Sequence, residues 1–259
     1  MSGRSYILAE TNWKHLKDNA FRLAVLPWGS TEAHNYHLPY GTDSLAAEYV
    51  AAEAAALSVQ KGGSPVVLPG IPYGVNTGQK DIPLCMNLNP SVQTLILQDI
   101  VDNLRHAGID ILVVLNGHGG NDFKSMIREL SGKNSDFFIC LVNWWLASDP
   151  SLYFEDLGEH AGESETSVML SLYPDWVLPL DGAGEGKALE FSLSAFREKW
   201  AWTQRDWPRV TRDTGVGNPR AASAEKGNRY LAACIEKIGA FLYALEKTPK
   251  SDFYREVLS

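Results

Sequence analysis

Ile109-Asp-Ile-Leu-Val-Val-Leu-Asn-Gly-His-Gly-Gly-Asn121 is the stretch of sequence that decides the fold. Its aliphatic part is far shorter than the about 18 apolar residues of a membrane-spanning helix and is typical of a buried strand. Glycines follow at once, and they let the backbone turn tightly or approach a ligand closely. A buried strand that ends in a Gly-rich loop favours an α/β protein with a parallel sheet.

Similar strands and longer helical patterns alternate on both sides of this stretch. Strands are expected near residues 23–26, 66–68 and 137–142, and helices near 45–60, 92–106, 121–130 and 221–245. Asn121 is the expected cap of the third helix, and the residues from 160 onward lead into another helix that ends near Leu172. Connections of this length suit crossovers between parallel strands. The sequence therefore predicts one three-layer α/β/α domain with a mostly parallel sheet over residues 1–259.

The composition of the chain argues against some classes of binding partner. The chain has 259 residues, with 23 Lys plus Arg against 31 Asp plus Glu, and a net charge of −8. An acidic protein is a poor partner for nucleic acid or for an anionic membrane surface, so we expect neither. The amino terminus shows no pattern of a secretory signal, and the three cysteines form no CxxC pair. We therefore expect reduced thiols and a cytoplasmic protein.

Imidazole and carboxylate groups gather in the loop expected after the first strand. Glu32 and His34 are separated by one residue, so in an extended loop both side chains point to the same side. Asp43 opens the next helix, and its two oxygens could bridge two cations. Such ligands suit zinc, manganese or iron. Taken alone, this cluster could equally be a solvated polar loop with a helix cap.

Two further clusters follow later strands. His118 lies in Asn116-Gly-His-Gly-Gly-Asn121, and His160 opens His160-Ala-Gly-Glu-Ser-Glu-Thr-Ser167. Each has a structural alternative, since the glycines could form a simple turn and the glutamates could be first-turn acids of a helix. The carboxyl ends of parallel strands meet at one edge of a sheet, where sites form. We expect the three clusters to converge there.

At these residues the sequence resembles the creatininase (creatinine amidohydrolase) family. The long motif Pro27-Trp-Gly-Ser-Thr-Glu-Ala-His-Asn-Tyr-His-Leu-Pro-Tyr-Gly-Thr-Asp43 carries the likeness, with Asn35 where glycine is usual. The second and third clusters and residues 215–227 also match motifs of the family, and they follow in the same order along the chain. The resemblance implies two divalent metal ions, either two zinc ions or zinc with manganese or iron. It also implies an oligomer, possibly a hexamer.

The resemblance assigns a role to each residue. Glu32, Asp43 and His118 are expected to hold one metal ion, and His34 and Asp43 the other, with Asp43 bridging. His160 is the expected proton carrier, and Glu165 is expected to be catalytic as well as a metal ligand. In the expected mechanism, His37 orients a ligand or contacts substrate, and backbone N–H groups near Gly119 and Gly120 contact the substrate.

One ligand position departs from the creatininases proper. They have a glutamate where this chain has Gly120, and we expect Glu165 to replace it, with Glu163 as the alternative. They also have an aromatic residue in place of Gly119 and a tryptophan in place of Asp156. Creatinine is therefore not the expected substrate.

The expected activity is hydrolysis of a C–N amide-type bond, in a cyclic amide or formamide of a small molecule, by a metal-activated water. One alternative is a deformylase or peptidase acting on a modified nucleobase or peptide. Another is a non-catalytic, metal-containing, oligomeric binding protein. A nucleotide-binding module is disfavoured, because the Gly-rich loop lacks GxGxxG and a GK[ST] ending.

Overall fold

A four-stranded parallel sheet forms the centre of the protein, and the computed structural model describes it within residues 4–256. The strands are β1 (Leu23–Trp28), β2 (Val66–Val67), β3 (Ile111–Asn116) and β4 (Phe138–Asn143), in the spatial order β2-β1-β3-β4. The central strands β1 and β3 are buried along their whole length. This explains their continuous apolar sequence, because both faces of a doubly covered sheet are apolar.

Alternate side chains of the strands enter two separate cores. Leu23 and Val25 of β1 pack with helices α2 (Thr42–Gln60) and α8 (Ala224–Lys247), whereas Ala24 and Leu26 pack on the opposite face. This follows from the two-residue repeat of a strand.

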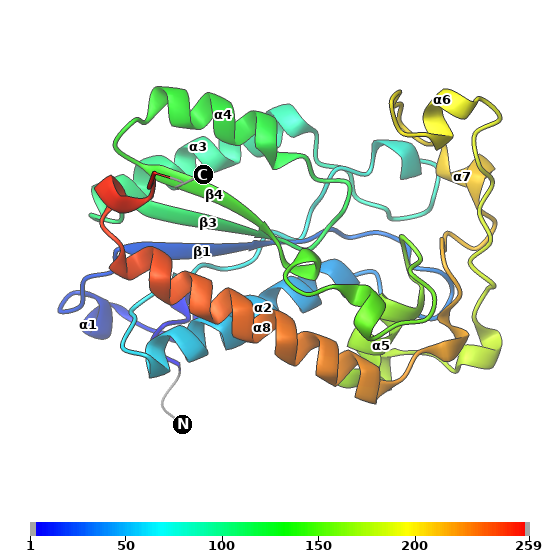
Figure 1. Cartoon of the computed structure of the whole chain (residues 1–259), viewed down its shortest axis with the longest axis horizontal. Helices are drawn as coiled ribbons and strands as arrows, with labels where there is room; N and C mark the ends of the chain where they lie inside the picture. Colours follow the sequence, from blue (N-terminus) through cyan, green and yellow to red (C-terminus); the bar gives the residue numbers. More distant parts are fainter. Residues whose placement is uncertain (1–3, 257–259) are drawn as a thin grey trace.

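Helices cover both faces of the sheet (Figure 1). Helices α3 (Pro90–His106) and α4 (Phe123–Lys133) lie on one face, and α2 and α8 lie on the other, where α5 (Glu163–Leu172) packs against both. The predicted α/β/α arrangement with a parallel sheet is confirmed. The expectation of one domain over residues 1–259 stays a prediction, and residues 1–3 and 257–259 lie outside the described part of the chain.

Two expected boundaries are wrong. β1 continues through Pro27 to Trp28, beyond the expected end near residue 26. It can do so because the Pro27 carbonyl faces the side on which the short β2 has already ended. The missing N–H of the proline therefore removes no bond of the sheet. Asp122, not Asn121, caps α4, while the Asn121 amide bonds the Val75 N–H and the Gln93 side chain.

Shorter elements complete the chain. The short helices are α1 (Trp13–Leu16), α6 (Ser194–Arg197) and α7 (Trp207–Val210), and the 3₁₀ helices are Leu8–Glu10, Thr77–Gln79, Trp144–Leu146, Pro150–Leu152, Pro174–Trp176, Leu180–Gly182, Pro219–Ala221 and Lys250–Asp252. Within residues 4–256, no helix has both the length and the apolar character needed to cross a membrane.

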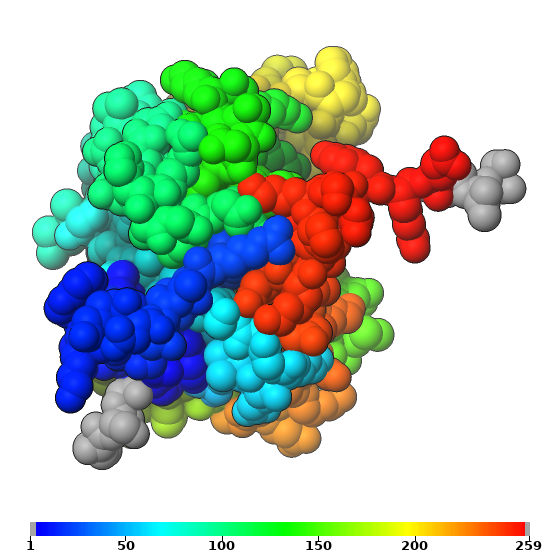
Figure 2. Space-filling model, turned by 90° about the vertical axis from the view of Figure 1, so that its left-hand side faces the viewer, coloured from blue at the N-terminus to red at the C-terminus, as the bar shows by residue number. Residues whose placement is uncertain are grey.

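The two ends of the sheet differ. α6 and α7 lie beyond the carboxyl ends of the strands (Figure 1), whereas the first and last segments of the chain both lie at the opposite end, which faces the viewer in Figure 2. The segments that carry the sequence motifs therefore lie at the other end of the sheet from α1 and from the end of α8.

Candidate metal centre

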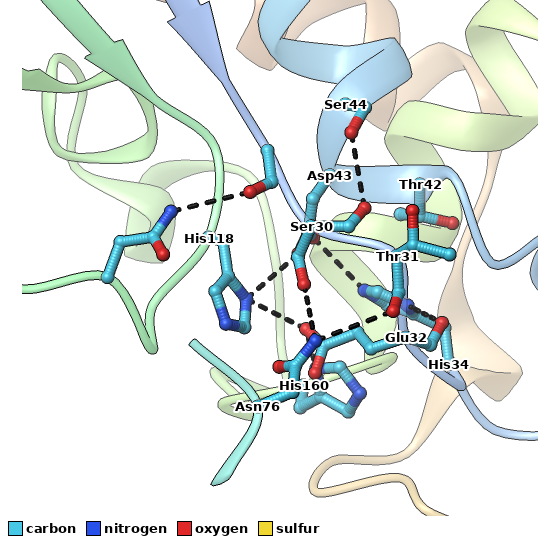
Figure 3. Close-up of polar contacts among 12 residues, drawn as sticks. Ser30, Thr31, Glu32, His34, Thr42, Asp43, Ser44, Asn76, His118 and His160 are labelled. Atoms are coloured by element: carbon cyan, nitrogen blue, oxygen red, sulfur yellow. Dashed lines mark hydrogen bonds and ion pairs between the residues drawn. The ribbon is translucent and has the colours of Figure 1, made fainter. Parts of the chain in front are cut away.

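The three sequence clusters converge beyond the carboxyl ends of β1 and β3 (Figure 3). The loop after β1 carries Glu32 and His34, the first turn of α2 carries Asp43, and the loop after β3 carries His118. Close packing makes this possible, because a Cβ atom at Gly117 would lie 2.5 Å from the carbonyl oxygen of Asp43. The start of α2 can thus lie directly on the loop after β3.

The carboxylates and imidazoles are at ligand-sharing distances. His118 Nδ1 lies 2.8 Å from Glu32 Oε1 and 2.9 Å from Asp43 Oδ2. His34 Nε2 lies 3.1 Å from Asp43 Oδ1 and 3.9 Å from Glu165 Oε2. The two groups Glu32–Asp43–His118 and His34–Asp43–Glu165 therefore share Asp43, which presents one oxygen to each.

Each imidazole at the centre is held in place by a backbone carbonyl. His118 Nε2 lies 3.1 Å from the Val75 oxygen, and His34 Nδ1 lies 3.1 Å from the oxygen of Glu32. His160 Nε2 lies 2.9 Å from the Ala33 oxygen. A carbonyl only accepts, so the ring nitrogen beside it carries the hydrogen and the other nitrogen faces the carboxylates. Histidines that bind metal ions are oriented in this way.

This arrangement fits divalent cations. With its Nε2 donating to a carbonyl, neutral His118 directs the Nδ1 lone pair at two carboxylate oxygens. Asp43 Oδ2 is buried and accepts no hydrogen bond. A lone pair against carboxylate oxygens is repulsive unless a positive charge lies between them, and a cation supplies that charge. The same donor set suits zinc or manganese.

The pKa values of the central residues also show that the centre favours positive charge. Burial alone would lower the pKa of His34, but the carboxylates of Asp43 and Glu165 outweigh it and raise this pKa to about 10. The pKa of His118 is likewise raised well above its usual value, against its burial, by Glu32 and Asp43. Burial would raise the pKa of Asp43, yet His34 and His118 hold it below its usual value. Without metal ions, the centre therefore binds protons.

Glu165 and Glu163 have different surroundings. Glu165 approaches His34 at the centre, and its Oε2 accepts a hydrogen bond from the Ala161 N–H at 2.5 Å. Glu163 is fully buried away from the centre, and it accepts the N–H groups of residues 155 and 156 and the Lys226 ammonium, the last at 2.5 Å. Of the two, only Glu165 belongs to a candidate ligand group among the described residues.

The two glycines after His118 differ in the space around them. A Cβ at Gly120 would collide with His118 Nε2 and lie 2.5 Å from the Val75 carbonyl. A glutamate there would thus break the contact that orients His118. A Cβ at Gly119 would meet nothing within 4 Å, because this residue borders open space. Both glycines line the pocket above the centre.

His37 lies beside the centre and not in it. Its Nε2 is 2.8 Å from Thr166 Oγ1 on α5, next to Glu165. Burial first, and then the charge of His34, lower the pKa of His37 to about 4, so this ring is neutral. It does not line the pocket described below, and its expected contact with substrate stays a prediction.

Asn35 connects the centre to a distant part of the chain. Its backbone is left-handed, with φ of 54°, a conformation that asparagine tolerates better than most residues. Its side chain accepts the Gly184 N–H at 2.8 Å and donates to the Gly184 oxygen at 3.1 Å. The amide thus ties the loop that carries His34 to the segment after α5.

Sequence patterns did not reveal two residues that support Glu32. The Gln79 amide donates to Glu32 Oε2, and Gln79 Oε1 lies 3.3 Å from the Cys85 thiol. Cys85 in turn accepts the Ala33 N–H at 3.2 Å. No motif surrounds Gln79, and nothing in the spacing of the cysteines indicated a role for Cys85.

A pocket of about 480 Å³ opens over the candidate centre. His160 and Trp207 both line it, and their ring centroids are 5.1 Å apart. The Arg205 guanidinium lies 4.9 Å from the Trp207 ring centre and 2.8 Å from a Glu159 oxygen. Trp202 and Trp207 both line this pocket.

Fold and site together define an α/β protein with a carboxylate–imidazole centre of the kind that holds divalent metal ions. The chain belongs to the creatininase family of hydrolases, because the family model described as creatinine amidohydrolase matches residues 9–242. This confirms the resemblance noted in the motifs.

Individual relatives agree with this membership. Creatinine amidohydrolase of Pseudomonas putida is 29% identical over 91% of this chain and 95% of its own length. Mycofactocin precursor peptide peptidase of Mycolicibacterium smegmatis is 32% identical over 82% of this chain and 81% of its own length.

Several solved structures are similar to this chain over nearly its whole length. A putative creatinine amidohydrolase from Bacteroides fragilis has a TM-score of 0.90 at 40% identity, covering 97% of this chain and 99% of that one. A creatininase structure described as the Mn form has a TM-score of 0.76 at 26% identity, covering 95% of this chain and 100% of that one.

Proposed function

We propose that this protein hydrolyses a C–N amide-type bond, of a cyclic amide or a formamide, at a centre of two divalent metal ions. The observation that carries the proposal is the pair of ligand groups that share Asp43, each with a carboxylate and an imidazole. Glu32, Asp43 and His118 would hold one ion, and His34, Asp43 and Glu165 the other. When bound, such ions lower the pKa of water to about 7 and polarise a carbonyl group.

The chain's own residues complete the reaction. His160 has Nε2 committed to the Ala33 carbonyl, so Nδ1 is the atom that would take a proton from the attacking water and pass it to the leaving nitrogen. Its Nδ1 lies 4.0 Å from Glu32 Oε1, within the same cluster of groups. Trp207 packs beside the ring and limits the access of water to it. Gly119 and Gly120 form the wall against which substrate would rest.

A second candidate activity is hydrolysis of a peptide bond or removal of a formyl group on the same centre. The peptidase from Mycolicibacterium smegmatis, which is 32% identical, favours the inclusion of peptides. A panel of lactams, formamides and short peptides, scored for new carboxylate, formate and amine, separates these reactions.

The proposal extends to the surroundings of the protein. We propose a small-molecule amide substrate, a homo-oligomer of up to six chains, and a cytoplasmic location without nucleic acid or membrane partners. Sedimentation equilibrium measures the subunit number, and cell fractionation measures the location.

Metal content is the decisive test. The protein is purified without added metal or chelator and analysed for transition metals beside the Asp43→Ala variant. We expect two equivalents per chain in the unaltered protein and loss of both in the variant, since Asp43 serves both groups. One equivalent, or loss of only one ion, would contradict the bridging role. No metal after reconstitution with zinc and manganese would favour a binding protein.

A further inference from the structure

A second hollow continues from the pocket over the candidate centre. It has a volume of about 750 Å³, and it shares four wall residues with that pocket, which are Glu159, Trp202, Thr203 and Arg205. The two hollows therefore adjoin, and a ligand at the centre could reach the second one past these side chains. We call this second hollow the side groove.

Large apolar side chains form a group in the walls of the side groove, beside charged ones such as Glu190 and Lys199. Leu157, Leu189, Phe191 and Phe196 line it, and Trp202 forms the ridge that it shares with the pocket. Trp202 is 84% exposed and Leu189 is 72% exposed. Large apolar side chains that gather next to a polar site, at such exposure, indicate a surface that is covered in function.

The side groove has a fixed shape. The Phe191 and Phe196 rings pack at 4.8 Å between centroids, and the Arg197 guanidinium donates to the carbonyls of Phe191 and Ser192 at 2.6 Å. Leu189 N–H donates to the Val210 oxygen at 2.7 Å, which closes the segment against α7. Because its walls are held together, the groove can bind a ligand without first being ordered.

We infer that the side groove binds a bulky apolar substituent of the substrate, so that the preferred amide carries a large hydrophobic group near the scissile bond. The inference rests on the proposed function, which places that bond in the adjoining pocket. A small cyclic amide alone would leave the side groove empty. Trp202, on the shared ridge, would pack against the substituent where it leaves the pocket.

The test uses zinc-loaded protein and hydroxamates, which chelate metal ions through a common head. Titration calorimetry compares acetohydroxamic acid with octanohydroxamic acid, whose tail is on the carbonyl, and with N-hexylacetohydroxamic acid, whose tail is on nitrogen. We expect at least one tailed compound to bind about tenfold or more tightly than acetohydroxamic acid, because each buried methylene strengthens binding. Leu189→Asp should abolish most of this gain and leave the affinity for acetohydroxamic acid unchanged, because Leu189 lines the side groove and not the pocket. Trp202→Ala, on the shared ridge, should also abolish most of the gain.

Leu95→Asp is the matched control, because Leu95 is also an exposed leucine but lies on α3, away from the groove. It should keep the full gain. Equal affinity for all three compounds would overturn the inference and leave the metal centre intact. Binding of none of them would overturn the metal centre as well.

A second copy of the chain is the competing occupant. Sedimentation equilibrium of the same variants separates the two, since a substrate groove leaves the subunit number unchanged. If Trp202→Ala lowers the subunit number while the tailed compounds keep their gain, the groove is an interface between copies and the inference is wrong.

Discussion

Glu163 and Glu165 should respond in opposite ways to the same change. Both are replaced by glutamine, which keeps the shape of the side chain and removes its charge. Glu163→Gln should weaken the fold and leave metal binding intact, whereas Glu165→Gln should weaken metal binding and leave the metal-free fold intact. The two residues are separated by one position in the same helical turn, so each variant is the control for the other.

The size of the first effect follows from the contacts of Glu163. Its carboxylate accepts two backbone N–H groups at 2.8 Å and the Lys226 ammonium at 2.5 Å. Hydrogen bonds to a charged group contribute about 1.5–3 kcal/mol, but the Lys226 side chain is 23% exposed, so solvent screens part of the ion pair. We expect a loss of about 2 kcal/mol, which in a chain of this length lowers Tm by about 4–8 °C.

The size of the second effect follows from the place of Glu165 in the centre. Its contact with the Ala161 N–H can be kept by the glutamine oxygen, so metal-free stability should change by less than about 0.5 kcal/mol. Metal affinity should fall further than the about 10–100-fold that loss of an outer partner of a metal ligand costs.

The assay has two arms. Circular dichroism of chelator-treated protein gives the Tm of each metal-free variant, and competition with a zinc chelator gives metal affinity. The reasoning is refuted if Glu163→Gln loses a metal ion while Glu165→Gln retains both, or if the two variants show the same loss in both arms.

Three further predictions follow from the contacts around the centre. Gln79→Leu should weaken metal binding at the group that contains Glu32 and leave Tm of the metal-free protein within a few degrees, because Gln79 donates to Glu32 Oε2. A two-step zinc titration measures the affinity at each metal position. Equal weakening at both positions would contradict this expectation. Asn35→Gly should lower the free energy of unfolding by about 1–3 kcal/mol, because the hydrogen bonds to Gly184 are lost. Asn35→Ala should lower it by about 1 kcal/mol more, because alanine is strained in the left-handed backbone conformation of this residue. Urea denaturation that ranks the two variants in the reverse order would disprove this effect of the backbone conformation. Metal affinity should rise with pH between 7 and 10, because the pKa of His34 is raised to about 10 without metal and its proton must leave before the ion binds. Chelator competition at pH 7 and 8.5 measures how steeply the affinity rises. An affinity that does not change with pH would show that His34 is neutral before the ion binds.

The layer arrangement could be predicted from sequence because it depends on local patterns. Continuous apolar runs of strand length, such as the one that ends at Leu115, are expected only where both faces of a sheet are covered. Boundaries were less accurate, because they depend on neighbours. Pro27 remains in its strand since the adjoining strand β2 is too short to require its N–H, and no feature of residues 23–28 records the length of β2.

Ligand chemistry and strand-end position drew attention to the three clusters, and the resemblance to the family then implied which of their residues are the candidate ligands. What sequence could not supply is the orientation of each side chain. The choice between Glu163 and Glu165 depends on Lys226, which is 63 residues further along the chain and neutralises Glu163 away from the centre. The support of Glu32 by Gln79 and Cys85 likewise depends on how one irregular loop folds back.

The sequence by itself determined the α/β class, the family and the identity of the candidate metal ligands, since these are encoded in strand-length apolar runs and in a long motif of imidazole and carboxylate residues. The tertiary structure alone decided which oxygen and which nitrogen face the centre, why a side chain at position 120 would collide with His118, and that a groove with large apolar side chains adjoins the pocket. Those features arise from contacts between segments far apart in the chain, and the distances between such segments depend on how the whole chain packs.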